Sequence, residues 1–192
     1  MPITVAPKQI VIGLMTGTVD APTRLGMIRS AELAVSQVNE DNRLPGWRLE
    51  LSVVDATKPD QVAKALRNLD DRREVAAIVG PADLATQAKL DQRPLTVLTV
   101  PLSEISPGPL SMAAFDEDYA ASQVAEPPGR LGPATYGAIV QLVADASPAV
   151  AGPEPDRAKL AAAVAQRLAA VATPSTTSTS STRPVTNEPN SA

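Results

Sequence analysis

The 192-residue sequence contains no histidine and no cysteine, and only four aromatic residues. Without these two residue types there are no disulfides, no cysteine or Ser-His-Asp nucleophiles, no zinc sites of the usual ligands and no imidazole acid or base. Glycine-rich phosphate loops of the GxGxxG or GxxxxGK[ST] type are also missing. Catalysis would need a convergent set of carboxylates or lysines, and none is visible, so we predict a protein that is not an enzyme and needs no cofactor.

Clusters of positive charge and long apolar runs are missing as well. The 17 Lys and Arg against 21 Asp and Glu give a formal net charge of −4 without a basic stripe, so nucleic acid is not an expected partner. No stretch reaches the roughly 20 apolar residues that cross a bilayer, and residues 1–11 lack the pattern of a secretory signal. We expect no membrane insertion. The protein is then cytoplasmic, or extracytoplasmic with a leader or anchor outside this chain.

The hydrophobic residues, 44% of the chain, predict one aliphatic core. Residues 3–172 have the usual length of a single domain. From Thr173 the sequence is almost entirely Ser, Thr, Pro and Asn, with little to bury. This composition predicts a disordered tail over 173–192.

Within residues 3–172 the hydrophobic period changes repeatedly, which indicates strands alternating with helices. Short apolar or alternating runs predict strands at Gln9–Met15, Arg48–Asp55, Val75–Gly80 and Leu95–Val100. Helical spacing and a proline start predict helices at Thr23–Glu40, Pro59–Leu69 and Ala82–Asp91. Short connections favour right-handed crossovers. The expected fold class is therefore α/β, with a doubly wound, mainly parallel sheet and the first strand in its interior.

Several polar features have a structural interpretation beside a functional one. The loop Thr16–Thr18 faces a ligand or is only a turn. Asp55 is expected to cap a helix or bind a loop. The charge runs Asp70–Glu74 and Asp116–Asp118 are expected to be solvated. Trp47 is expected to cover the edge of the core rather than a ligand.

Five short motifs follow one another in a distinctive order. They are IGLMTG at Ile12–Gly17, AELAVSQVN at Ala31–Asn39, LPGW at Leu44–Trp47, LELSVVD at Leu49–Asp55, and VAAIVGP at Val75–Pro81. The fourth motif is a predicted strand that ends in Asp. Over about 8–101 they resemble the type I periplasmic binding proteins, the family that includes Leu/Ile/Val-binding receptors of ABC transporters. The resemblance implies a Rossmann-like lobe.

Members of that family have two lobes and bind their ligand in the cleft between them. Phe115–Ala125 is similar to the segment that approaches the first crossover, and Gly132–Ala146 to the helix by which the chain returns. Asp156–Val171 is similar to the helix that follows. Only a few residues separate the first two segments, so the resemblance implies a single lobe whose partner lobe is deleted near 126–131.

The resemblance also implies a ligand site in the loops after the strands, where open parallel sheets bind ligands. In the family, hydroxyl residues there hold the carboxylate and amino group of an amino acid. At the expected hydroxyl position after Gly80 stands the apolar Leu84, and Thr86 is the alternative. Glu104 would repel a carboxylate beside it. The candidate ligand-binding residues are Thr16, Thr18, Gly80, Thr86, Thr99 and Ser103.

Two functions remain open. The resemblance implies a non-catalytic solute-binding or sensor domain for a small polar metabolite such as an amino acid. Alternatively, the lobe has kept the fold, lost the ligand and acts as a protein interaction or scaffold module. Leu84 favours the second function, because a recognition site is not expected to place an aliphatic side chain at its main hydroxyl position.

Deletion of a lobe predicts an exposed apolar patch on the face that the lobe would cover. Such patches usually mark interfaces, so we expect a homodimer or a protein partner at Leu102–Phe115. Alternatively, this segment folds back over the sheet edge and covers itself, which the turn at 107–109 permits. The patch residues are Leu98, Val100, Leu102, Ile105, Leu110, Met112 and Phe115.

Overall fold

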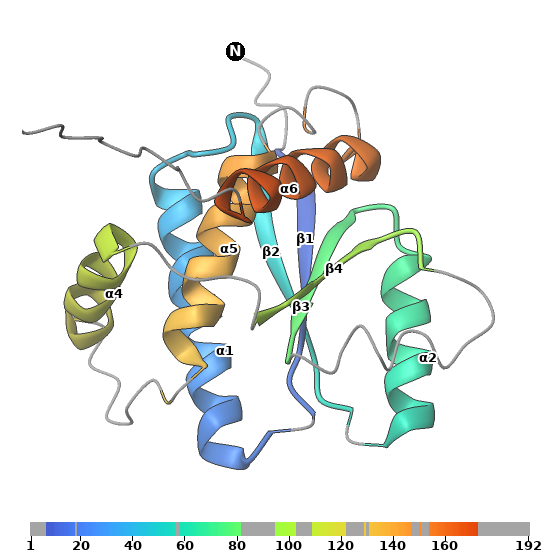
Figure 1. Ribbon diagram of the computed structural model, residues 1–192, viewed down its shortest axis with the longest axis horizontal. Coiled ribbons are helices and arrows are strands. Elements are labelled where there is room, and N and C mark those ends of the chain that lie inside the picture. The colour runs from blue at the N-terminus through green and yellow to red at the C-terminus, as the bar shows by residue number, and fades with distance from the viewer. Residues whose placement is uncertain are drawn as a thin grey trace, which may run out of the picture.

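The computed structural model describes residues 7–17, 19–56, 58–81, 95–102, 109–121, 129, 131–146, 150 and 154–172. Its strands form one sheet in the order β2-β1-β3-β4, and each neighbouring pair is parallel (Figure 1). The strands are β1 (Lys8–Met15), β2 (Trp47–Val54), β3 (Val75–Gly80) and β4 (Leu98–Pro101). The helices are α1 (Ala21–Glu40), α2 (Pro59–Asp70), α4 (Pro109–Ala121), α5 (Gly132–Ala146) and α6 (Arg157–Ala172).

This topology confirms the predicted doubly wound α/β fold with β1 in the interior of the sheet. The first three strands begin and end within one residue of their predicted bounds. Helix α1 begins earlier than predicted because Asp20 caps it, accepting a hydrogen bond from the N–H of Thr23 at 2.9 Å. The helix predicted over 82–91 and the tail over 173–192 lie outside the described residues.

Strand β4 begins at Leu98, three residues later than predicted. The N–H groups of Thr96 and Val97 both donate to the carboxylate of Asp70, at 2.9 and 2.7 Å. Because each backbone N–H is a single donor, these two are not available to a neighbouring strand. The pairing with β3 therefore starts at Leu98, opposite Ala77.

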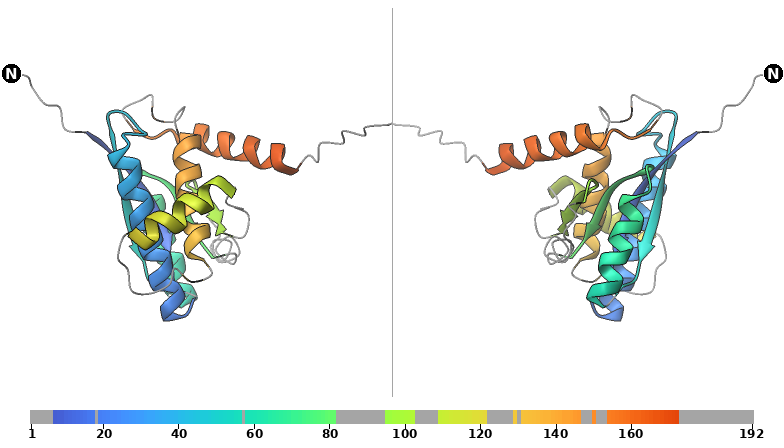
Figure 2. Two further views of the ribbon diagram at one scale, coloured as in Figure 1. Left: turned by 90° about the vertical axis from the view of Figure 1, so that its left-hand side faces the viewer. Right: turned by 90° about the vertical axis from the view of Figure 1, so that its right-hand side faces the viewer.

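The helices cover the two faces of the sheet unequally. Helices α1 and α5 pack side by side on one face, α2 covers the other, and α4 lies against α1 and α5 (Figure 1). Helix α6 crosses the end of the sheet at which β3 begins, and Figure 2 shows it extending beyond the other helices. Successive strand residues point to opposite faces, so Ile10 and Leu14 join the core under α1 and α5, while Val11 and Met15 join the core under α2.

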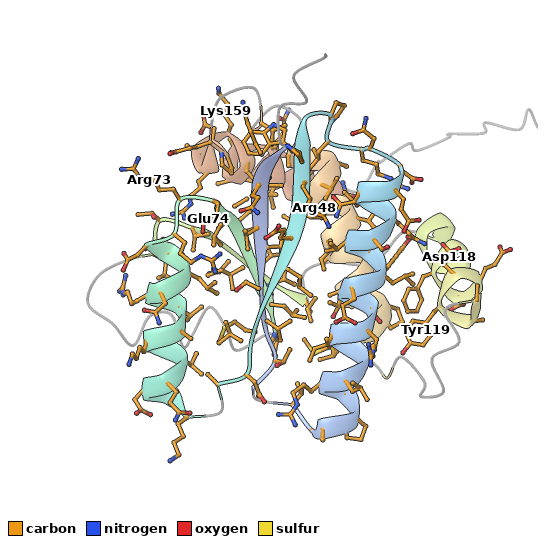
Figure 3. The ribbon with its side chains drawn as sticks, turned by 180° about the vertical axis from the view of Figure 1, so that it is seen from behind. Arg48, Arg73, Glu74, Asp118, Tyr119 and Lys159 are labelled. Carbon is orange, nitrogen blue, oxygen red and sulfur yellow. The ribbon has the colours of Figure 1, made fainter. Side chains whose placement is uncertain are left out.

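Three of the four aromatic side chains meet where α4 packs on α5. The ring of Phe115 is fully buried, and its centroid lies 5.2 Å from that of Tyr119 and 5.0 Å from that of Tyr136. Gln37 of α1 accepts a hydrogen bond from the Tyr136 hydroxyl and donates one to Asp118, each at 2.5 Å. Figure 3 shows Asp118 and Tyr119 on the side of α4 that is next to α1. These contacts hold α4 against both neighbouring helices.

The predicted exposed apolar patch is not found among the described residues. Val100 and Leu102 are each 3% exposed and Phe115 is not exposed at all, and all three belong to the core under α1 and α5. Leu98 is half-buried and packs against the same core. The expected exposure is wrong for these residues, because β4 and α4 cover the chain's own core. The side chains of Ile105, Leu110 and Met112 lie outside the described part.

Candidate functional site

The carboxyl ends of the strands meet at one edge of the sheet, opposite the edge that α6 crosses (Figure 1). The strand order reverses beside β1: the chain passes from β1 to β2 on one side, and β3 lies on the other side. In open parallel sheets such a reversal leaves a crevice at the carboxyl ends of the two strands, and ligands bind there. Thr16, Gly17 and Pro81 directly follow β1 and β3 at this position.

Thr16 closes the end of β1 against β2. Its N–H donates to the carbonyl oxygen of Val54 at 3.1 Å, and its hydroxyl donates to the same oxygen at 3.5 Å. The residue is fully buried. In this structure the Thr16 hydroxyl is therefore part of the junction between β1 and β2.

Gly17 is required by a close approach of two backbone segments. A Cβ atom built on Gly17 would lie 1.6 Å from the carbonyl oxygen of Ala56, in the chain that leaves β2. A backbone carbonyl cannot rotate away as a flexible side chain can, so only glycine fits here. The packing alone explains the glycine in the predicted Thr16–Thr18 loop.

The other candidates lie on the far side of β1. Gly80 is buried at the end of β3, and the register between β1 and β3, which pairs Leu14 with Val79, places it level with Met15, one residue before Thr16. Thr99 is half-buried on β4 opposite Ile78, two residues before the level of Gly80. The structure thus brings Thr16 and Gly80 together and places Thr99 further from the edge. Thr18, Thr86 and Ser103 lie outside the described residues, as do Leu84 and Glu104.

A charged pair that the sequence analysis missed lies at the same edge. Arg24, in the first turn of α1, places its Nη1 2.7 Å from Oδ2 of Asp55, which follows β2. Asp55 was expected to cap a helix or bind a loop. The capping role is wrong, because Lys58 is the N-cap residue of α2, and Asp55 pairs with Arg24. The two side chains are 32% and 49% exposed, so this edge offers both a cation and an anion to solvent.

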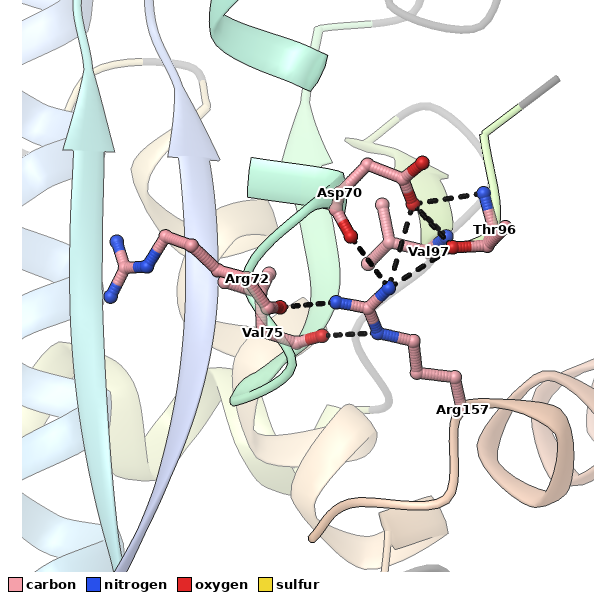
Figure 4. A network of polar contacts seen from close by, with 6 residues as sticks. All are labelled: Asp70, Arg72, Val75, Thr96, Val97 and Arg157. Atoms are coloured by element: carbon pink, nitrogen blue, oxygen red, sulfur yellow. Dashed lines mark hydrogen bonds and ion pairs between the residues drawn. The ribbon is translucent and has the colours of Figure 1, made fainter. Parts of the chain in front are cut away.

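A polar network around Arg157 lies at the opposite edge (Figure 4). The guanidinium donates to the carbonyl oxygens of Val75 and Asp70, both at 2.8 Å, to that of Arg72, and to the Thr96 hydroxyl at 3.1 Å. Its Nη1 also lies 3.5 Å from the Asp70 carboxylate, whose side chain is 1% exposed. The charge run that begins at Asp70 was expected to be solvated. At Asp70 this is wrong, because the carboxylate turns inward to α6 and β4.

The Asp70 carboxylate stays ionised in this buried place. Burial by itself raises its pKa, but hydrogen bonds from the Thr96 hydroxyl and from the N–H groups of Val97 and Thr96, together with the charge of Arg157, lower the pKa below its ordinary value. A closed carboxylate with a low pKa is a poor general base. We therefore assign this network to the anchoring of α6 and β4, and not to catalysis.

Two further properties of the described residues bear on function. They contain no group of three or more Asp or Glu side chains that could hold a metal ion. In addition, no helix in the described part of the chain is both long and apolar enough to span a bilayer.

No family model matches the chain, and no curated protein matches it. Among solved structures, a possible leucine/isoleucine/valine-binding protein from Rhodopirellula baltica SH 1 matches at 17% sequence identity and a TM-score of 0.43, over 73% of this chain and 46% of that one. An ABC transporter substrate-binding protein from Sphaerobacter thermophilus matches at 19% identity and a TM-score of 0.40, over 70% of this chain and 44% of that one. These are proteins of the kind that the sequence motifs resemble, and this chain spans less than half the length of each.

Proposed function

We propose that this chain is a non-catalytic recognition domain that binds a small polar metabolite of the amino-acid type at the carboxyl edge of its sheet. One observation carries the proposal: the strand order reverses beside β1, so the ends of β1 and β3 form the place where doubly wound sheets take their ligands. The proposed ligand-binding residues are Thr16, Thr18, Gly80, Thr86, Thr99 and Ser103.

The charges at this edge favour a zwitterion over a simple anion. Arg24 and Asp55 are both partly exposed and within hydrogen-bonding distance of each other. An α-amino acid carries a carboxylate that matches Arg24 and an ammonium group that matches Asp55. Exchange of this exposed ion pair for a ligand costs little, because such pairs contribute only about 0–1 kcal/mol to stability.

A single lobe gives such a site only one wall. Ordinary pockets bury roughly 70–90% of a small ligand, which an open sheet edge does not do. We therefore propose weak binding by the isolated chain and tighter binding when a partner protein or a second copy closes over the edge. The sequence predicted an apolar contact surface at Leu102–Phe115, but Leu102 and Phe115, the described residues at its two ends, are buried. We therefore propose that such a partner contacts a different surface.

A second candidate function is that of an interaction module without a ligand. The burial of Thr16 favours this second function, because the hydroxyl that would donate to a ligand donates to the carbonyl oxygen of Val54. The apolar Leu84 at the position of a family hydroxyl favours it too.

Ligand screening by thermal shift, with each of the twenty common amino acids in turn, separates the two functions. A binder at a hundredfold excess over its Kd adds about 2.7 kcal/mol of stability, which raises the melting temperature measurably. If calorimetry at millimolar amino acid also detects no binding, the recognition function is excluded and the interaction module remains.

The location of the site is tested by replacing Thr99 and Ser103 together with Ala. We expect weaker binding of the amino acid found in the screen and a nearly unchanged melting temperature. The control replaces Ser36, a hydroxyl residue near the end of α1 and beside the start of β2, with Ala, and should bind as the wild type does. Equal affinity of the double variant and the control would place the site elsewhere.

A further inference from the structure

Strand β2 is the outermost strand of the sheet, so one side of its backbone has no neighbouring strand in the described structure. The N–H of Lys8 donates to the carbonyl oxygen of Gly46, and that of Thr16 to the carbonyl oxygen of Val54. In a parallel ladder, residues face the neighbouring strand alternately. The even-numbered residues of β2 therefore face β1. The outward backbone groups belong to Trp47, Leu49, Leu51 and Val53.

The first part of this outer edge is already closed. The N–H of Trp47 donates to the carbonyl oxygen of Leu44 at 2.9 Å. At Leu49, the side-chain amide of Asn39 makes two hydrogen bonds: Nδ2 donates to the carbonyl oxygen and Oδ1 accepts from the N–H, each at 2.9 Å. A directly opposed residue of an adjacent antiparallel strand would make the same pair of bonds. Asn39, near the end of α1, thus takes the place of a strand.

Further along, the outer edge is open. No backbone hydrogen bond to an outward group of Leu51 or Val53 is present among the described residues, and Val53 is 41% exposed. A hollow of about 660 Å³ lies between the end of α1 and β2, where Trp47, Arg48 and Leu51 line it, and it reaches the open stretch at Leu51. The open stretch is short, from 51 to 53, whereas typical strands pair over about five or six residues.

We propose that Asn39, by its two hydrogen bonds to Leu49, prevents a second copy of this chain from pairing with the outer edge of β2. An antiparallel pair related by a two-fold axis at Leu51 would place Leu51 opposite its own copy and Leu49 opposite Val53 of the second copy. All three outward residues would then find partners, and Glu50 would face Ser52 rather than a like charge. With Asn39 bonded to Leu49, both Leu49–Val53 pairs are lost and only the central pair remains.

Amide hydrogen exchange of the wild-type protein tests the bonds themselves. The N–H of Leu49 should exchange at least about tenfold more slowly than those of Leu51 and Val53, because one hydrogen bond of about 1.4 kcal/mol corresponds to that factor. Equal exchange rates at the three outward positions would overturn the proposal.

Sedimentation at increasing concentration tests the effect on assembly. The wild type should stay monomeric, whereas Asn39→Ala should form a concentration-dependent dimer. Ser36→Ala is the matched control: Ser36 lines the same hollow one turn earlier, but its hydroxyl bonds to Glu40 of the same helix and, among the described residues, to no backbone group of β2. This variant should therefore stay monomeric. Should Asn39→Ala fail to fold, Asn39→Ser, whose hydroxyl reaches at most one of the two backbone groups, should show the same dimer.

A second substitution identifies the surface that pairs. Lysine on an edge strand opposes pairing with another strand, so Asn39→Ala/Val53→Lys should be monomeric again. A dimer that persists in this double variant uses another surface and would contradict the proposal. A monomer in both Asn39 variants would also contradict it, as would a wild-type dimer that Val53→Lys dissociates.

Discussion

At the residue scale, Asp70 depends on donors that lie far from it in the sequence. Its carboxylate accepts hydrogen bonds from Thr96 and Val97, 26 and 27 positions away, and its backbone carbonyl accepts one from Arg157, 87 positions away. None of these partners can be recognised from the charge run in which Asp70 stands. The residue therefore joins α2, β4 and α6 at one point.

Asp70→Ala should lower the free energy of unfolding by about 2–5 kcal/mol, because it leaves the N–H groups of Thr96 and Val97 without their acceptor, and each unsatisfied buried donor costs about 1–3 kcal/mol. Arg157 loses its counter-charge but keeps its bonds to three carbonyl oxygens. The control is Asp41→Ala, which removes an exposed carboxylate paired with Arg43 and should cost no more than about 1 kcal/mol. Urea denaturation at pH 7 measures both. Equal costs for the two variants would show that the Asp70 network adds nothing beyond a surface ion pair.

The contribution of Asp70 should also depend on pH. Its pKa in the folded protein is lowered, so its stabilisation is fully present above the ordinary carboxyl pKa of about 3.9 and is lost as the pH falls through the lower folded value. In urea titrations between pH 7 and 2, the difference between wild type and Asp70→Asn should be constant above about pH 5 and shrink below pH 4. A difference that persists unchanged at pH 2 would show that the charge is not its source.

At the scale of the elements, α1 serves several neighbours at once. Arg24 near its start pairs with Asp55 at the carboxyl edge, Gln37 bonds to α4 and α5, and Asn39 closes the edge of β2. The helical repeat turns these side chains towards different neighbours. A helix that covers a sheet thus also shapes the candidate ligand edge and the outer edge of the sheet.

Helix α4 is attached through Phe115, whose ring is fully buried between Tyr119 and Tyr136. Phe115→Ala should lower the free energy of unfolding by about 3–5 kcal/mol, the usual cost of removing a buried aromatic ring. Glu117→Ala, an exposed change on the same helix, should be within about 0.5 kcal/mol of the wild type. If Phe115 instead served as a contact for a partner, its replacement would leave the stability of the isolated chain unchanged.

At the scale of the whole molecule, the described residues of the expected apolar patch are covered by the chain itself. Val100, Leu102 and Phe115 lie in the core, and Val53 is the large hydrophobic residue that stands out as exposed in the described part. The sheet ends in β2, whose outer backbone is partly closed by Asn39. These features favour a lobe that is stable without a second copy.

We therefore expect sedimentation at micromolar concentration to give a single species of 19.9 kDa. A stable interface usually needs a sizeable apolar contact, and the described residues do not provide one at Leu102–Phe115. A dimer under these conditions would restore the association predicted from the sequence. Crosslinking would then show which surface makes the contact.

Much of the fold could be predicted from the sequence, and less of the candidate site. The strand Val75–Gly80 has its predicted bounds, because six consecutive small and apolar residues suit a strand buried on both faces. The site depends on neighbours that no local pattern reveals. From the sequence, Thr16 is expected in a loop, but the structure buries it beside the end of β2. Asp55 is expected to cap a helix, but it pairs with Arg24 of α1.

By itself, the sequence determined the alternation of strands and helices, since hydrophobic period is a local property, and its lack of histidine and cysteine removed whole classes of chemistry. Only the tertiary structure decided which polar side chains face solvent. Asn39 and Asp70 are ordinary helix-end residues in the sequence, and they acquire their roles from the backbone groups of β2 and β4 that the fold brings to them. Backbone N–H and C=O groups that no neighbouring strand pairs need another hydrogen-bond partner. Only the folded chain determines which side chain can reach them.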